Sequence, residues 1–151
     1  MSKEPYLTPP TRGYSYVLKA DVKAKMISVA DSQRENRGME LIIQKSRALI
    51  KGHLHELVVT IDTKAKPGKI VNSVAYLGMI EIVSSGLVVV SDDVFINNKK
   101  IGEVAGFDET HFPNHMNILI RVKKLSTGFK MGLKLGSCIR FSLKSNIKFT
   151  G

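Results

Sequence analysis

A ten-residue segment in the second half of the chain, DETHFPNHMN, carries most of the side chains that could do chemistry. It runs from Asp108 to Asn117 and holds two histidines, two carboxylates and two asparagines. A carboxylate beside an imidazole tunes the imidazole pKa near neutrality, which suits general acid and general base catalysis. An asparagine adds a neutral donor and acceptor for a polar ligand. The segment predicts a site for a small polar molecule.

Each of these side chains receives a role from its type. The predicted catalytic residues are the two imidazoles and the two carboxylates, His111, His115, Asp108 and Glu109. In this hypothesis one imidazole is the base or the acid, and Asp108 orients it. The two amides, those of Asn114 and Asn117, are predicted to bind the ligand.

The same segment also has a structural interpretation. The Asp108 carboxylate could cap a turn, because Asx side chains bond nearby backbone amides. Asn114 follows Pro113 and could only shape a turn. Either His115 or Asn117 could be a buried polar residue with satisfied hydrogen bonds. Since Pro113 excludes a regular helix, we predict a loop or a helical turn that places the imidazoles in the mouth of the fold.

A second pair of histidines, His53 and His55, lies in the stretch IKGHLHEL. Residues i and i+2 of a strand point to one face, so both imidazoles could converge on one ligand. We predict both as ligand-binding residues, with a turn or bulge at Gly52 just before them. Surface histidines beside a turn are the alternative interpretation.

A divalent metal is an option at both places. The H-x-H spacing occurs among metal ligands, and the later segment adds imidazole nitrogens and carboxylate oxygens. Two residues are too few to fix a metal, so the metal and any cofactor stay unassigned. The glycines form neither a Walker loop nor a dinucleotide fingerprint, because no predicted helix follows them.

Short β-branched runs must position these groups. Residues 70–107 separate into the runs IVNSVAYL, MIEIV, GLVVV, VFIN and IGEVAGF, with Gly78, SSG, SDD and NNKK between them. Such runs at short spacing are typical of an antiparallel barrel or sandwich. Asn97 and Asn98 suit a tight hairpin, because asparagine tolerates positive φ.

Strand patterns continue on both sides of this block. Residues 14–26 alternate apolar and polar side chains, which predicts a long half-buried strand. Further runs are MELII, ALI and LVVTID before the block and ILIRVKKL, CIRFSL and NIKF after it. No segment of ten or more residues keeps the helical period. The predicted fold class is all-β, a small antiparallel β-barrel or sandwich with little helix.

The domain organisation follows from composition. Residues 1–13 hold three of the five prolines and little to bury, which predicts a flexible N-terminal arm. Residues 14–151 are long enough for one hydrophobic core and predict a single β-barrel domain.

The net charge of +10 is concentrated at the two ends of the chain. Residues 119–151 hold eight Lys or Arg and no Asp or Glu, whereas residues 71–118 hold two against six. The basic tail from Arg121 to Lys148 could bind nucleic acid or an acidic partner, or it could be an ordinary solvated surface. Seventeen lysines against six arginines, ten aromatics and no tryptophan argue against base-specific reading.

The sequence predicts a cytoplasmic protein without a membrane span. No apolar run approaches the roughly 20 residues that cross a bilayer, and the start lacks the apolar core of a secretory signal. The single cysteine, Cys138, cannot form an internal disulfide, which fits a reducing compartment, and we predict a packed thiol in a strand. The oligomeric state stays open, and an oligomer is compatible with the sequence.

Several short segments together resemble one protein family, the glucitol/sorbitol-specific IIA component of the bacterial phosphotransferase system. The family's L-K-G-x-L-H stretch is similar to Ile50–His55, and its later strand segment is similar to Ile101–Val104. Its E-x-x-F-P turn matches Glu109–Pro113, and its closing G-S-x-L-x-F strand resembles Gly136–Phe141. The resemblance covers roughly residues 40–142 and implies a small β-barrel.

The chain departs from that family at the phosphorylation site. The family has histidines before the L-K-G stretch, one of which is expected to carry the phosphoryl group. Here the corresponding residues are Gln44, Lys45, Ser46 and Arg47. The resemblance therefore implies a relative with a changed role. Besides an enzyme or a small-molecule binding protein, a non-catalytic regulatory module of the IIA type is an alternative.

Overall fold

The computed structural model of the protein describes residues 19–144, and within them every regular element is a β-strand. The predicted all-β fold with little helix is confirmed. The strands are β1 (Val22–Met26), β2 (Gln33–Arg34), β3 (Met39–Glu40), β4 (Ser46–Leu49), β5 (Leu54–Thr60), β6 (Ile70–Val71), β7 (Val74–Ser84), β8 (Gly86–Val89), β9 (Asp93–Ile96), β10 (Lys99–Asp108), β11 (Asn117–Arg121) and β12 (Cys138–Ser142).

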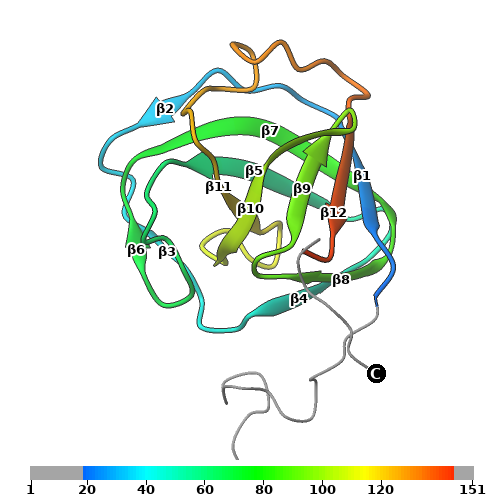
Figure 1. Cartoon of the computed structure of the whole chain (residues 1–151), viewed down its shortest axis with the longest axis horizontal. Coiled ribbons are helices and arrows are strands. Elements are labelled where there is room, and N and C mark those ends of the chain that lie inside the picture. Colours follow the sequence, from blue (N-terminus) through cyan, green and yellow to red (C-terminus); the bar gives the residue numbers. More distant parts are fainter. Residues whose placement is uncertain (1–18, 145–151) are drawn as a thin grey trace, which may run out of the picture.

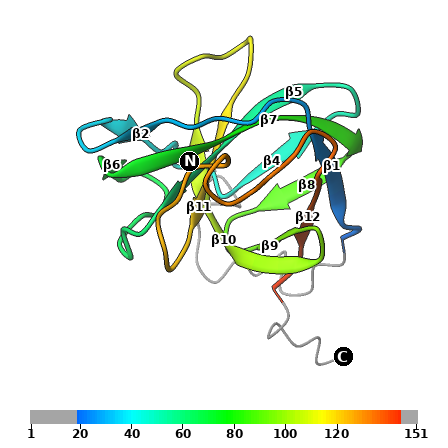
Figure 2. The same cartoon turned by 90° about the horizontal axis from the view of Figure 1, so that it is seen from above.

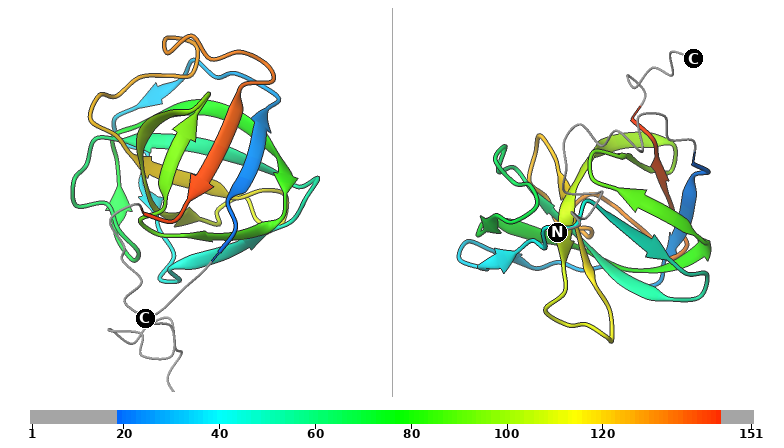
Figure 3. Two further views of the ribbon diagram at one scale, coloured as in Figure 1. Left: turned by 45° about the vertical axis from the view of Figure 1, so that its right-hand side comes forward. Right: turned by 90° about the horizontal axis from the view of Figure 1, so that it is seen from below.

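Most of these strands form a barrel. The largest sheet has eight strands in the order β1-β12-β9-β10-β11-β5-β7-β2, and β1 also pairs with β7. Without β2, which is attached to β7, the order returns to its start and forms a ring of seven strands (Figure 1). Figure 3 shows this barrel from two further sides. Beside the ring, β3 pairs with β6 and β4 pairs with β8.

One pair of strands in the ring is parallel. In this pair, β5 and β11, Glu56 lies opposite Asn117 and Thr60 lies opposite Arg121. The other six pairs in the ring are antiparallel. Antiparallel neighbours reverse direction at every step, so an odd number of strands cannot close without a parallel pair. The antiparallel prediction thus holds for six pairs, and the ring of seven requires one exception.

The main hydrophobic core fills the interior of the barrel. Every strand of the ring contributes fully buried side chains to it, for example Val22 from β1, Leu57 from β5 and Phe141 from β12. Alternate residues of each strand point inward because the side-chain period of a strand is two. In β1 the same alternation appears as buried and exposed residues in turn, in agreement with the period-two pattern predicted up to Met26.

A second apolar cluster covers the outer face of part of the barrel. It joins Val58 of β5 and Leu119 of β11 to Met39, Leu41 and Val71, which lie in and beside the β3–β6 ribbon. Both faces of β5 and β11 are therefore buried, which explains the uninterrupted apolar runs LVV and ILI. This outer face also carries the polar groups of the candidate site.

Local turn predictions are confirmed in one hairpin and wrong at one glycine. Asn97 and Asn98 form the two-residue loop between β9 and β10, with φ of 49° and 67°. Gly78 was expected to separate two strands, but β7 runs through it. A Cβ at Gly78 would lie 2.1 Å from the backbone oxygen of Ser28. Glycine is needed there because another segment passes close to the strand, and no turn is present.

Several predictions fall outside the described residues. These are the N-terminal arm of residues 1–13, the first part of the strand predicted over residues 14–26, the NIKF strand, and the last part of the basic tail. Within residues 19–144, no helix is long and apolar enough to cross a membrane. Cys138 lies in β12 as predicted, but its side chain is exposed, so the predicted packed thiol is wrong.

Candidate functional site

The parallel pair β5–β11 brings the two histidine-bearing segments together. The backbone N–H of Met116 donates a hydrogen bond to Nδ1 of His55 over 3.1 Å, and the Glu56 N–H donates to the Met116 carbonyl over 3.0 Å. Residues 53–56 therefore lie directly beside the end of the segment that the sequence singles out. Neither segment alone predicts this contact.

His55 is a buried, neutral residue that serves the structure. Its side chain is 7% exposed, and Nδ1 already accepts the Met116 N–H. Burial, followed by the nearby His53, His115 and Arg47, lowers the His55 pKa to about 4. His53 precedes β5 and is exposed. The imidazoles of the H-x-H pair thus differ in exposure, and Nδ1 of His55 is occupied.

The segment between β10 and β11, residues 109–116, forms a turn-rich loop, as Pro113 predicts. The Asp108 carboxylate caps its first turn by accepting the Thr110 hydroxyl at 2.6 Å and the Thr110 N–H at 3.3 Å. The structural interpretation of Asp108 is therefore confirmed. Figure 2 shows the loop, drawn in yellow, projecting from the barrel. His111 and Asn114 are exposed, so the expected placement of the loop in the barrel mouth is wrong.

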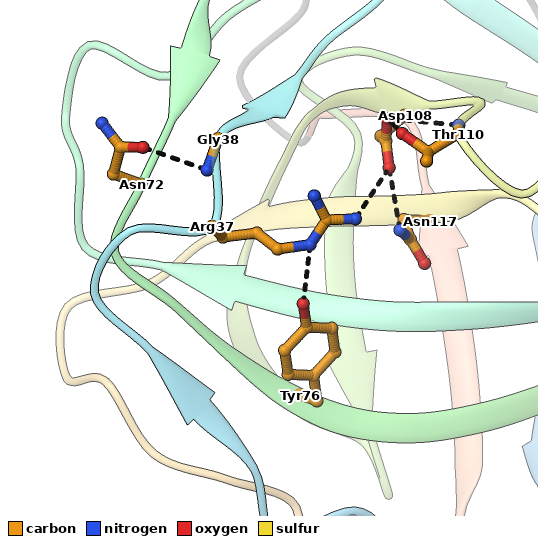
Figure 4. A network of polar contacts seen from close by, with 7 residues as sticks. All are labelled: Arg37, Gly38, Asn72, Tyr76, Asp108, Thr110 and Asn117. Carbon is orange, nitrogen blue, oxygen red and sulfur yellow. Dashed lines mark hydrogen bonds and ion pairs between the residues drawn. The ribbon is translucent and has the colours of Figure 1, made fainter.

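A buried network lies at the base of this loop (Figure 4). Asp108 is 2% exposed and accepts the Asn117 Nδ2–H over 2.8 Å, while Nη2 of Arg37 lies 3.7 Å from the same Oδ2 atom. Nε of Arg37 donates to the Tyr76 hydroxyl over 2.9 Å. Arg37 comes from the connection between β2 and β3. The network ties this connection to β7, β10 and β11.

Two polar groups in this region lack protein partners. Asn117 is 1% exposed, and its Oδ1 atom has no hydrogen bond within residues 19–144. Glu56 lies opposite Asn117 on β5, so the two side chains share the outer face. The half-buried Glu56 carboxylate has no ion pair or hydrogen bond within the described part of the chain. Burial raises its pKa, although His111 and Arg37 oppose the shift.

We define the outer-face polar cluster by these neighbouring groups. Its members lie on, or act electrostatically on, the outer face of β5 and β11: Arg37, Glu56, Tyr76, Asp108, His111 and Asn117. The cluster combines a buried acceptor without a partner in residues 19–144, the half-buried Glu56 carboxylate, and a guanidinium that is ion-paired with Asp108 and donates to Tyr76. The cluster therefore contains both hydrogen-bond donors and hydrogen-bond acceptors.

The remaining predicted residues lie along the loop. The rings of His111 and His115 stack with centroids 4.9 Å apart, and Nδ2 of Asn114 is 3.0 Å from Nδ1 of His115. Burial, with a further contribution from His111, lowers the pKa of His115. The Glu109 carboxylate forms an ion pair with Arg47, whose guanidinium also lies 5.2 Å from the centre of the Phe112 ring. This contact anchors the loop to β4.

The predicted set is therefore divided between different environments. Asp108 and Asn117 meet in the buried network, and His111 and His115 meet on the loop. Asp108 has no hydrogen bond to an imidazole in residues 19–144, so the hypothesis that it orients a catalytic histidine is wrong. Within the same residues, no three His, Cys, Asp or Glu side chains are placed to hold a metal ion.

Sequence reasoning missed three members of the cluster. Glu56 carried a usable signal, because it is the one carboxylate in the mostly apolar strand LHELVVT. Arg37 appeared only as part of a polar loop, and Tyr76 as part of an apolar run. Their contacts join residues 39 positions apart and cannot be read from local spacing.

Of the comparisons with known proteins, only the one with family models gives a match to the chain. No curated protein and no solved structure matches it. One family model matches residues 16–142, and its description is a family of unknown function, DUF6917. Because this match spans most of the chain, the protein belongs to the DUF6917 family.

Proposed function

We propose that the protein binds a small polar molecule at the outer-face polar cluster. The observation that carries this proposal is the buried Asn117 Oδ1 atom, which has no hydrogen-bond partner within residues 19–144 and lies on the strand next to the half-buried Glu56 carboxylate. A buried polar atom without a partner costs free energy, and nearly all such atoms in proteins are satisfied. A ligand that donates hydrogen bonds at this place would satisfy both groups.

The charges of the cluster indicate the class of ligand. The two acceptors call for an ammonium group or hydroxyl groups on the ligand. Arg37 can present N–H groups to a carboxylate, and its Nε atom is held in position by the Tyr76 hydroxyl. A molecule that carries both kinds of group, such as an amino acid or a hydroxy acid, is complementary to this arrangement.

Acid–base catalysis at the same cluster is the second candidate function. It is favoured by the raised pKa of Glu56, since a carboxyl group with a perturbed pKa is typical of proton-transfer sites, and by the position of the His111 imidazole near it. In this candidate the Glu56 carboxyl exchanges a proton with the ligand beside His111, in place of the imidazole oriented by Asp108 that the sequence suggests. Turnover of a bound ligand would distinguish it from simple binding.

The resemblance to the phosphotransferase IIA component supports a binding or regulatory role. The segment that corresponds to the family's phosphorylation site, residues 44–47, contains no histidine and so lacks a phosphoryl-accepting imidazole. Its Arg47 instead pairs with Glu109. We place the protein in the cytoplasm, where an exposed thiol such as that of Cys138 stays reduced.

The test is a binding screen with amino acids, hydroxy acids and uncharged polyols at millimolar concentration. Thermal shift identifies the binders, because a ligand that binds only the folded state raises the melting temperature. Isothermal titration then compares the wild type with Glu56→Gln, which removes the charge and keeps the shape. We expect an amino or hydroxy acid to bind, and Glu56→Gln to weaken that binding at least about tenfold, the loss of one charged hydrogen bond.

Glu81→Gln is the matched control, because Glu81 is also half-buried on a barrel strand but lies outside the cluster. It should leave ligand affinity unchanged. The proposal fails if no charged member of the panel binds, or if the two glutamine variants lose affinity equally.

A further inference from the structure

A basic groove lies at the start of β10 and the end of β11, opposite the ends of these strands that carry the loop at residues 109–116. It has a volume of about 940 Å³ and is lined by residues at the ends of β5 and β11, the start of β10 and the connection from β11 to β12. Six of its lining residues are cationic, namely Lys99, Lys100, Arg121, Lys123, Lys124 and Lys130. The acidic lining residues are Asp62 and Glu103.

Much of this positive charge is uncompensated. Glu103 is held by Arg121 at 3.7 Å and by Lys144 at 3.0 Å, and Lys100 pairs with Asp93 at 3.0 Å. The other four lysines of the groove are exposed and have no ion pair within residues 19–144. Like charges gathered without counter-charges repel one another, and a bound anion would relieve this repulsion.

A second hollow extends the groove. It has a volume of about 390 Å³, is lined by Lys64, Lys66 and Lys69, and shares Thr63 and Arg121 with the first. The two hollows together form a continuous basic surface along the segments 61–69, 99–103 and 121–131. The combined volume of the two hollows exceeds what a single phosphate group needs and suits several anionic groups in series.

We propose that this surface binds single-stranded nucleic acid through its phosphates, without reading sequence. Lysine presents a point charge that suits phosphate, whereas arginine is the usual reader of bases. Apolar side chains, including Ile61, Ile101 and Val122, line the first groove between the lysines and can contact sugars and bases. Among the described residues no aromatic side chain lines either hollow, so base stacking contributes little and all sequences should bind alike.

Fluorescence anisotropy with a labelled oligothymidine and an oligouridine tests this proposal. The groove variant carries Lys99→Ala, Lys123→Ala, Lys124→Ala and Lys130→Ala. The control variant carries Lys23→Ala, Lys25→Ala, Lys45→Ala and Lys51→Ala, four exposed lysines that line neither hollow. Both variants lose the same charge. We expect the groove variant to lose affinity at least about tenfold and to show a shallower dependence on salt, because fewer counterions are released.

The other arms of the experiment overturn the proposal. Equal losses in the two variants would mean that net charge alone attracts the oligonucleotide. Tripolyphosphate that competes as well as an oligonucleotide, on a phosphate basis, would indicate a site for a small anion. Binding to vesicles of anionic phospholipid without binding to oligonucleotides would indicate a membrane surface instead. Absence of oligonucleotide binding at low ionic strength would also refute the proposal.

Discussion

His55 and Met116, 61 residues apart, are joined by a hydrogen bond of 3.1 Å from the Met116 N–H to the buried His55 Nδ1 atom. The bond forms at the start of the parallel pair of β5 and β11, which closes the seven-stranded ring. Nδ1 accepts only when the imidazole is neutral, so this joint between two strands depends on the protonation state of one side chain.

The first prediction concerns stability in acid. The His55 pKa in the folded protein is about 4, below its ordinary value of 6.5, so the unfolded chain binds the proton more readily. Stability from this residue is fully present above pH 6.5 and is lost as the pH falls towards 4. The loss approaches about 3 kcal/mol over that window. Urea unfolding between pH 7 and pH 4 measures this loss.

His55→Asn should flatten this pH dependence, because the asparagine oxygen can accept the Met116 N–H and does not titrate in that range. His53→Asn is the control, since His53 is exposed. If the His53 variant flattened the pH dependence of stability and the His55 variant left it unchanged, the dependence could not be assigned to His55.

The second prediction concerns the cost of the Glu56 charge. Its raised pKa means that folding disfavours the ionised carboxylate, so Glu56 lowers stability as the pH rises above its ordinary pKa. Glu56→Gln should therefore raise the melting temperature at pH 7 in the absence of ligand. At pH 4 the carboxyl is largely protonated, and the variant and the wild type should melt alike.

The same substitution connects stability with function. If Glu56 binds a ligand, the glutamine variant is more stable but binds more weakly, which is the expected behaviour of a residue retained for function. Glu81→Gln should change neither quantity. A Glu56→Gln variant that melts lower than the wild type at pH 7 would show that the carboxylate stabilises the fold.

The sequence predicts the strands of this protein well and its site only in part. The β-branched runs and the Asn97–Asn98 hairpin depend on residues that are close in the chain, so local patterns are sufficient. The pairing of Glu56 with Asn117 depends on β11 lying beside β5, and no local pattern encodes that neighbour. For this reason Asp108 and Asn117 are recognised from the sequence, whereas the proximity of Arg37 and Glu56 to them emerges only from the fold.

The third prediction concerns a buried ion pair that belongs to neither candidate site. Nζ of Lys19 lies 3.1 Å from Oδ2 of Asp92, and both side chains are almost fully buried. Lys19→Met should leave the Asp92 carboxylate without its counter-charge and destabilise the protein by about 3 kcal/mol or more. Chemical unfolding at pH 7 measures the loss.

Adding Asp92→Asn to the Lys19→Met variant should recover part of the stability, because the buried charge is removed together with its partner. The sum of the two single losses in unfolding free energy should therefore exceed the loss in the double variant. Strict additivity would show that the two side chains do not interact.

The fourth prediction isolates the positioning of Arg37. The Tyr76 hydroxyl accepts the Arg37 Nε–H over 2.9 Å, and the guanidinium reaches Asp108 from the other side. Tyr76→Phe removes this acceptor and keeps the ring, so it should cost only about 1 kcal/mol of stability. It should weaken the binding of an amino or hydroxy acid, because Arg37 is then free to turn away from the ligand carboxylate.

A double-mutant cycle separates this indirect effect from direct contact. Arg37→Lys keeps the positive charge but loses the forked geometry of the guanidinium. If Tyr76 acts through Arg37, adding Tyr76→Phe to the Arg37→Lys variant should cause no further loss of affinity. Isothermal titration of the four proteins measures the coupling, and independent losses from the two substitutions would mean that the Tyr76 hydroxyl contacts the ligand itself.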